Sequence, residues 1–252
     1  MQAPEALRRP AFAIVGLAAL LALVAAAGPA LAHDPDFTSQ FRLEDCTWLS
    51  NGEQNPYFKL RPGYRLTLEG EDETALVTVL RQTKRIKFTT PNGKRLNVIT
   101  RVVEEREFED DELVEVSRNF FARCKETSDI FYFGEEVDDF EDGELVGHEG
   151  AWLAGVDGAL PGIIMPGTFL LGARYFQEIA PGVALDRGEN VAMDIDITTP
   201  AGAFHDCVSV VDTDALDPED PGDVKIYCPG VGIVMDEDLE LVEIEHLGPG
   251  ED

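Results

Sequence analysis

The chain has 252 residues and a formal net charge of −29 at neutral pH, from 20 basic and 49 acidic side chains. Such a surface repels phosphate backbones and anionic headgroups, which argues against a nucleic-acid partner. Hydrophobic residues make up 44% of the chain and alternate with the acidic ones. Disordered acidic segments lack that pattern, so we expect a folded protein.

The first 32 residues have the features of a signal peptide. Arg8 and Arg9 precede an apolar run over 11–27, and a Gly-Pro breaker then leads to Ala-Leu-Ala at 30–32. This pattern predicts cleavage before His33 and a secreted or periplasmic protein without stable membrane insertion afterwards. An uncleaved anchor remains the alternative.

A repeated pentapeptide marks the organisation of the rest. TTPNG at 89–93 returns as TTPAG at 198–202, and the same offset aligns 63–102 with 172–211 without gaps. We interpret this as an internal duplication. The predicted parts are a first β half (33–152), a Gly/Pro-rich crossover or rim loop (153–171), a second β half (172–247) and a flexible tail (248–252).

The residues around each pentapeptide predict a β-hairpin. Pro at the first central position and Gly two residues later suit a turn with a bulge, and β-branched residues flank it. Further turn signals follow at short intervals, among them Asp142-Gly143. The expected fold class is mainly β, with antiparallel meander sheets that are barrel or half-barrel like and few helices. One barrel and two lobes both remain open.

The four cysteines lie in the exported portion, where an even count indicates disulfides. Cys207 and Cys228 are equidistant from the centre of the acidic loop 212–223, so they would face each other across a hairpin. We predict this pair. Cys46 with Cys124 then follows by elimination.

Several stretches together resemble an uncharacterised family of exported bacterial β-rich proteins. They are NPYFKLRPGYRLTLEG, RNFFARC with FYFGEEV, TTPAGAFHDC and YCPGVGIVMDEDLELVE, spanning 55–243. The resemblance implies export and a β-rich fold, and it implies no activity. The chain departs from the family pattern at Cys228, where a small residue is usual, so the resemblance does not extend to that disulfide.

Motifs for catalysis are incomplete. No serine lies in G-x-S-x-G, HEGAW at 148–152 lacks the second histidine of a zinc protease, and no phosphate-binding glycine loop is present. We therefore name no catalytic residue and do not favour an enzyme. The alternative to a binding or structural protein is an extracytoplasmic hydrolase with unidentified carboxylates.

Two metal hypotheses come from clustered ligands. The loop around 212–223 offers calcium the oxygens of Asp212, Asp214, Asp217 and Asp220, which would make a calcium-dependent surface protein. A free N-terminus at His33 could bind copper with a second histidine, one of His148, His205 and His246. A solvated loop and incidental histidines are the simpler interpretations, and no cofactor is predicted.

Aromatic residues gather on two adjacent predicted strands. Phe121, Phe131 and Phe133 are candidates to line an apolar pocket that holds a small ligand between sheets, and a place in the core is the alternative. Arg65 with Glu69, and Arg174 with Glu178, are expected to form ion pairs at equivalent positions of the two halves. The resulting hypothesis is a secreted or periplasmic binding or structural protein whose ligand and protein partners are unknown.

Overall fold

The structure is a computed structural model that describes residues 36–251 except 53, 218 and 220. The predicted signal peptide lies outside the described residues. Within them, the one helical element is a 3-10 turn, η1 (Leu43–Asp45), and no helix is long and apolar enough to cross a membrane. The strands are β1 (Trp48–Leu49), β2 (Tyr64–Glu69), β3 (Glu73–Thr89), β4 (Arg95–Glu109), β5 (Glu112–Cys124), β6 (Ile130–Glu141), β7 (Glu144–Gly147), β8 (Trp152–Leu153), β9 (Leu160–Met165), β10 (Arg174–Phe176), β11 (Glu178–Ile179), β12 (Asp186–Thr199), β13 (Gly202–Asp214), β14 (Asp223–Cys228), β15 (Gly232–Asp236) and β16 (Leu239–His246).

The strands form one continuous antiparallel sheet that nearly closes on itself. The hydrogen-bonded order runs β10-β12-β13-β14-β15-β16-β2-β3-β4-β5-β6-β9-β11. Its two ends, β10 and β11, are consecutive in the chain, with only Gln177 between them. A sheet whose ends meet in this way is barrel-like and has few free edges. This confirms the predicted fold class. Of the two alternatives left open by the sequence, one barrel or two lobes, the structure has a single continuous sheet.

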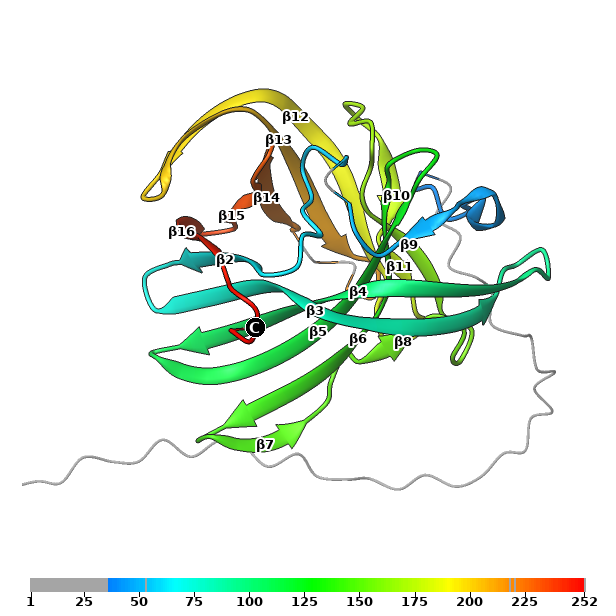
Figure 1. Cartoon of the computed structure of the whole chain (residues 1–252), viewed down its shortest axis with the longest axis horizontal. Helices are drawn as coiled ribbons and strands as arrows, with labels where there is room; N and C mark the ends of the chain where they lie inside the picture. Colours follow the sequence, from blue (N-terminus) through cyan, green and yellow to red (C-terminus); the bar gives the residue numbers. More distant parts are fainter. Residues whose placement is uncertain (1–35, 53, 218, 220, 252) are drawn as a thin grey trace, which may run out of the picture. The chain divides into compact units, whose positions relative to one another are not determined.

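The two pentapeptides lie at the tips of the longest hairpins, as predicted. Thr89 pairs with Arg95 at the β3–β4 tip, and Thr199 pairs with Gly202 at the β12–β13 tip. Gly93 and Gly202 have φ of 87° and 145°, which a side chain would strain. Figure 1 shows both hairpins, with the yellow β12–β13 arching away from the cyan and green β3–β4. The duplication itself stays a prediction.

The crossover contains a strand, contrary to the expectation of loop structure for 153–171. Residues 160–165 form β9, which pairs with β6 on one side and β11 on the other. Gly162 makes this possible, because a Cβ there would lie 2.3 Å from the Phe176 carbonyl oxygen. Glycine and proline in a sequence favour a loop, but here pairing with β6 and β11 holds the segment as a strand.

The ion pairs expected along single strands form across strands instead. Arg65 pairs with Glu245 of β16, directly opposite, and Arg174 pairs with Glu189 of β12. Residues four apart on a strand share a face but are separated by about 13 Å of chain, whereas directly opposite residues have Cβ atoms about 5 Å apart. The expectation of pairs with Glu69 and Glu178 was therefore wrong.

Two buried polar side chains hold irregular backbone in place. The Arg101 guanidinium donates to the carbonyls of Leu80, Arg81 and Gln82, where β3 shifts register against β4. The amide of Asn55, fully buried in the NPYF stretch, donates to carbonyls at Ser128, Met165 and Pro166 and accepts from the Tyr57 N–H. These bonds join the start of the fold to the ends of β6 and β9.

Candidate functional site

The inward-facing side chains of the sheet are apolar at one end and acidic at the other. Strand pairing places Val103 and Glu105 of β4 on one face with Val77 of β3. Through β13 and β14 the same alternation places Val208 and Asp212 with Tyr227 and Lys225. Because residues two apart on a strand share a face, each of these strands changes from apolar to charged along one side. The polar end is the candidate site.

A cavity of about 270 Å³ opens at this acidic end. We define its rim carboxylates as Glu105, Glu107 and Asp236, which lie with Lys225 in its lining. Further lining residues come from β3, β4, β5, β16 and the turn between β15 and β16: Glu73, Thr74, Ala75, Phe108, Glu109, Val114, Glu237 and Leu239. Negative charge in this lining far exceeds positive charge.

Lys225 is the ammonium group at the centre of this cluster. Its Nζ lies 3.2 Å from an Asp236 oxygen and 3.8 Å from an Asp212 oxygen. Burial lowers the pKa of Lys225, but the two carboxylates outweigh this and hold the net pKa well above its ordinary value. The lysine is therefore charged and already bound between two aspartates.

The carboxyl groups around Lys225 have raised pKa values. Burial, then repulsion by Glu107, raises the pKa of Glu105 to about 8 despite Lys225. Burial and the charges of Glu107 and Asp139 raise the pKa of Glu115 to about 7. Burial raises the pKa of Asp212 to about 6, although Lys225 opposes the shift. One ammonium does not neutralise this group, so its carboxylates compete for protons near neutral pH.

A second carboxylate group consists of Glu135 of β6, Glu178 of β11 and Asp186 of β12. The Asp186 N–H donates to a Glu178 oxygen at 2.6 Å, and burial, followed by the charge of Asp186, raises the pKa of Glu178 well above its ordinary value. Burial raises the pKa of Glu135 to about 7, with Glu115 and Asp186 adding repulsion. Glu115 thus couples the second group to the rim carboxylates.

Aromatic rings line the same face. The Tyr132 ring meets Trp152 edge to face at 5.2 Å between centroids, and its hydroxyl donates to Asn119. Tyr175 donates to Asn190 from the opposite part of the sheet. Carboxylates combined with aromatic faces are the groups that proteins use to bind organic ammonium ions.

The apolar end of the interior is nearly filled. Its cavity has a volume of only about 50 Å³, between side chains that include Phe58, Leu66, Val79 and Tyr227. Such a space accommodates a water or a methyl group rather than a whole ligand. It is too small to be a ligand site alone.

A larger cleft of about 680 Å³ lies between the segment 39–44, the β3–β4 tip and β9. Its charged lining side chains are already engaged. Arg42 pairs with Asp45 at 2.6 Å, and Glu44 accepts from Asn92 at 2.6 Å. The charge imbalance that marks the acidic cavity is therefore lacking among the described residues of this cleft.

The three described residues of the four suggested for calcium do not converge. Asp212 faces Lys225 and Gln177, whereas Asp214 and Asp217 accept backbone N–H groups two residues ahead in the loop. Asp220 lies outside the described residues. Short acidic side chains commonly make such bonds in turns, so the spacing in sequence reflected loop chemistry. Asp212 does belong to a site, but as part of the interior acidic end.

The histidines suggested for copper are also separate. His148 bonds the Val137 carbonyl, His205 contacts Asp196, and His246 stacks near Tyr64. His33 lies outside the described residues. Among the residues that the structure describes, the one group with metal-ligand spacing is Cys46, Cys124 and Glu126, whose sulfurs form a disulfide.

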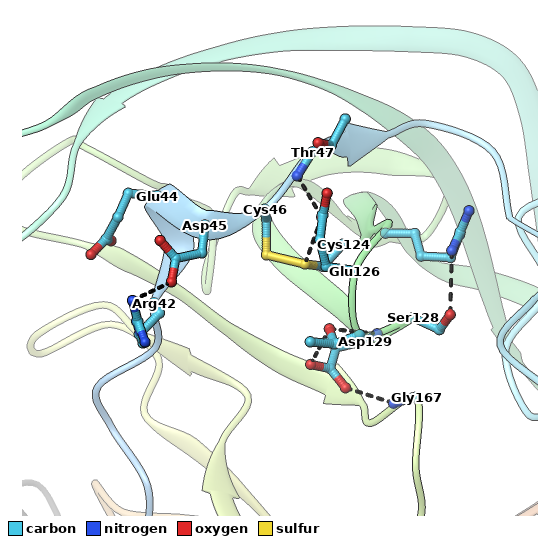
Figure 2. Close-up of a disulfide and its surroundings, with 12 residues drawn as sticks. Arg42, Glu44, Asp45, Cys46, Thr47, Cys124, Glu126, Ser128, Asp129 and Gly167 are labelled. Atoms are coloured by element: carbon cyan, nitrogen blue, oxygen red, sulfur yellow. Dashed lines mark hydrogen bonds and ion pairs between the residues drawn. A yellow bond between two sulfur atoms is a disulfide. The ribbon is translucent and has the colours of Figure 1, made fainter.

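Figure 2 shows that disulfide and the contacts around it. Glu126 accepts the Thr47 N–H at 2.7 Å, and Asp129 accepts the Gly167 N–H at 2.7 Å, beside the bridge. The first bond joins the residue before β1 to the β5–β6 turn, and the second joins that turn to the segment after β9, so the bridge has a structural role. Cys207 pairs with Cys228 across β13 and β14. Both pairs are those predicted, and they fit an oxidising compartment outside the cytoplasm.

The three phenylalanines proposed for an apolar pocket lie on two faces of the sheet. Phe121 contacts Phe58 and Tyr132 on the inner face. Phe131 and Phe133 contact Trp48 on the other face. All three are buried and packed by rings, so the pocket interpretation was wrong at these positions and the core alternative is correct.

Sequence reasoning missed Glu105, Glu107, Glu135 and Lys225 as site residues. Each stands in a strand among many other acidic or alternating residues, and nothing local distinguishes it. The usable signal was the single lysine in DVKIYC, which stands between two acidic loops, together with the alternation of side chains along its strand. Side-chain alternation shows which residues of a strand share a face, but it does not show which face points inward until the order of the strands in the sheet is known.

No protein-family model matches the chain, and no curated protein matches it. Among solved structures, the chain is similar to one from Bacteroides fragilis described as a candidate exported protein with a YmcC-like fold. The identity is 15% and the TM-score 0.31, over 75% of this chain and 98% of the other. Function is therefore inferred from this chain's own side chains.

Proposed function

We propose that this is an extracytoplasmic binding protein that holds a small cationic molecule in the acidic end of its barrel-like interior. The observation that carries the proposal is the cavity of about 270 Å³ whose lining combines Glu105, Glu107 and Asp236 with Lys225. Ligand sites in proteins are concave and contain a few convergent polar groups with perturbed pKa values.

The electrostatics favour a cation over an anion or a neutral molecule. Glu107 repels both Glu105 and Glu115, and Asp236 repels Glu107, and in each case this repulsion adds to desolvation in raising the pKa. A ligand ammonium would remove part of that repulsion, whereas an anion would increase it. Lys225 already shows that an alkylammonium fits between Asp212 and Asp236. The ammonium of the proposed ligand makes the same type of contact with the rim carboxylates.

The hydrocarbon part of the ligand would face the apolar side of the interior. Ala75 and Leu239 contribute to the cavity lining beside the carboxylates. The purely apolar cavity is too small to receive a separate hydrophobic molecule, at about 50 Å³. An apolar ligand, the sequence-based hypothesis, is therefore retained only as the apolar portion of an amine.

The test compares two probes of the same shape. Cyclohexylamine and cyclohexanol are titrated into the protein by calorimetry at about pH 9, above the raised pKa values of Glu105 and Glu115, so that their carboxylates are ionised. We expect the amine to bind and the alcohol to bind at least about tenfold more weakly, because one well-placed charge pair contributes about 1.5 kcal/mol or more. Equal binding of the two probes, or binding of neither, contradicts the proposed function.

A further inference from the structure

We propose that the cation bound in the acidic cavity is an aliphatic diamine, with one ammonium beside the rim carboxylates and the second between Glu73 and Glu109. The inference rests on the proposed function and specifies the ligand class for the same cavity. It starts from the number of carboxylates in the cavity lining, which a single ammonium does not balance.

Six carboxylates and one ammonium line the acidic cavity. The carboxylates are those of Glu73, Glu105, Glu107, Glu109, Asp236 and Glu237, and the ammonium is that of Lys225. Lys225 is already bound between Asp212 and Asp236. The Glu105 carboxyl, in contrast, is desolvated and has no hydrogen-bond or ion-pair partner among the described residues. Unmatched negative charge inside a cavity favours a ligand with more than one positive charge.

These carboxylates form a row along β4 rather than a single point. Glu105, Glu107 and Glu109 are each two residues apart, so they share one face of the strand at intervals of about 7 Å. Two such intervals separate the buried end of the row, at Glu105, from its exposed end, at Glu109. The row therefore offers separate positions for two ammonium groups.

The exposed end of the row is a pair of like charges. Glu109 stands directly opposite Glu73 in the β3–β4 pair, and both side chains are exposed. Directly opposite residues have Cβ atoms about 5 Å apart, and like charges in these positions repel each other. Desolvation is the main cause of the raised pKa of Glu107, and the charges of Glu73 and Glu109 add to it. An ammonium between Glu73 and Glu109 would relieve both repulsions.

A metal ion does not suit this arrangement. Calcium requires about six to eight oxygen ligands within about 2.6 Å of one point. Among the residues that the structure describes, the group whose three ligand atoms lie within 4.8 Å of one another is Cys46, Cys124 and Glu126, not a group in the acidic cavity. A diamine carries the same double charge but distributes it along a chain, so its carboxylate partners need not converge.

The cavity lining also provides for the carbon chain between the two ammonium groups. Ala75 stands directly opposite Glu107, on the face that carries the glutamate row, and Leu239 is a further apolar residue of the lining. A chain of about five carbons separates its two nitrogens by about 7 Å, which is close to one interval of the row. Cadaverine, a five-carbon diamine, is therefore a suitable probe.

Glu141 and Glu144 provide a matched control for Glu73 and Glu109. They also stand directly opposite each other, in the β6–β7 pair, and both are exposed. Neither of them lines the acidic cavity. The double variants Glu73→Gln/Glu109→Gln and Glu141→Gln/Glu144→Gln therefore remove the same charge from the same type of position, but only the first changes the proposed site.

The experiment titrates cadaverine, pentylamine and calcium chloride separately into the wild type and both double variants by calorimetry. A pH of about 9 ionises Glu105, and about 0.15 M salt screens weak binding to the acidic surface. Cadaverine and pentylamine have the same carbon chain and differ by one ammonium. We expect cadaverine to bind the wild type about tenfold or more tightly than pentylamine, and Glu73→Gln/Glu109→Gln to reduce this preference to about twofold or less. Glu141→Gln/Glu144→Gln should preserve it.

The other outcomes separate this inference from the proposed function. The diamine inference is overturned, while the cationic site stands, if pentylamine binds the wild type as tightly as cadaverine or if Glu73→Gln/Glu109→Gln keeps the full preference. An equal loss of preference in both double variants, or calcium binding as tight as that of cadaverine, also overturns it. If neither amine binds, the proposed function fails and the inference fails with it. Circular dichroism verifies that both variants are folded.

Discussion

Lys225 and Asp236 stand directly opposite each other in the β14–β15 pair, and their charged atoms are 3.2 Å apart. The pair is enclosed by further acidic groups, so Lys225 neutralises more than its nearest partner. Lys225 therefore helps to hold the acidic interior together. Its ammonium also illustrates the type of group that we propose the interior binds.

Lys225→Met should destabilise the protein strongly at neutral pH. The substitution keeps much of the side-chain volume but leaves Asp212 and Asp236 without their cation. Breaking a fully buried pair costs about 3 kcal/mol or more, so we expect a loss of about 2 kcal/mol here, where the Lys225 and Asp236 side chains are 27% and 22% exposed. Urea unfolding measures the loss. The double variant Lys225→Met/Asp236→Asn should recover about half of it, and a double variant no more stable than the single one would contradict the role of charge.

Stability should fall as the pH rises from about 5 to about 8. The pKa of Glu105 is raised to about 8 in the folded protein from 4.5, so between these values the folded state holds a proton that the unfolded chain has lost. Bound protons then favour the folded state, and each rise in pH removes part of that advantage. Denaturant midpoints across this range should therefore decrease.

Glu105→Gln should flatten this pH dependence. The amide cannot ionise, so at about pH 8 the variant should be more stable than the wild type by roughly 2 kcal/mol, after allowance for solvent reaching the cavity. Glu240→Gln, which makes the same charge change at an exposed position of β16, should leave the slope as it is. Equal slopes in the wild type and Glu105→Gln would show that the raised pKa is wrong.

Asn55→Ala should cost about 2–4 kcal/mol of unfolding free energy. It removes an amide that bonds carbonyls at Ser128, Met165 and Pro166, and it leaves those buried groups without their donor. Asn51→Ala, at an exposed position of the same segment, is the control and should change stability by less than about 0.5 kcal/mol. Thermal or urea unfolding compares the two variants. Similar losses of unfolding free energy in both would show that the Asn55 hydrogen bonds do not stabilise the fold.

The two disulfides should differ in their contribution to stability. Cys46 and Cys124 are separated by 78 residues, and Cys207 and Cys228 by 21. The entropy removed from the unfolded chain grows with the logarithm of that separation, so removing the first bridge should cost about 1 kcal/mol more than removing the second. Double Cys→Ala variants measured by urea unfolding test this, and the reverse order would indicate that local contacts dominate.

Local signals in the sequence were sufficient for hairpins and bridges. TTPNG and TTPAG each fix a turn by proline and glycine chemistry, and symmetry about the loop 212–223 identified the Cys207–Cys228 pair. The alternation of apolar and polar residues predicted the antiparallel β class. These features depend on neighbours within a few residues or on one hairpin, where sequence spacing translates directly into geometry.

Features that depend on long-range pairing were not accessible in this way. β9 is a strand because β6 and β11 flank it, although its own residues, LPGIIM, include a proline and a glycine. The acidic site unites β4, β5, β6, β11, β12, β13, β14 and β15. Strand order decides which of many carboxylates face inward. Phe131 and Phe133 were placed in a pocket because their face was unknown.

The most direct test of the cationic interior is the affinity of cyclohexylamine for Glu105→Gln/Glu107→Gln compared with Glu240→Gln, by calorimetry at about pH 9, above the raised pKa of Glu105 of about 8. We predict that the interior double variant loses about tenfold or more in affinity and that the surface variant retains wild-type binding. Unchanged binding by the interior variant, or an equal loss in both, would contradict the account.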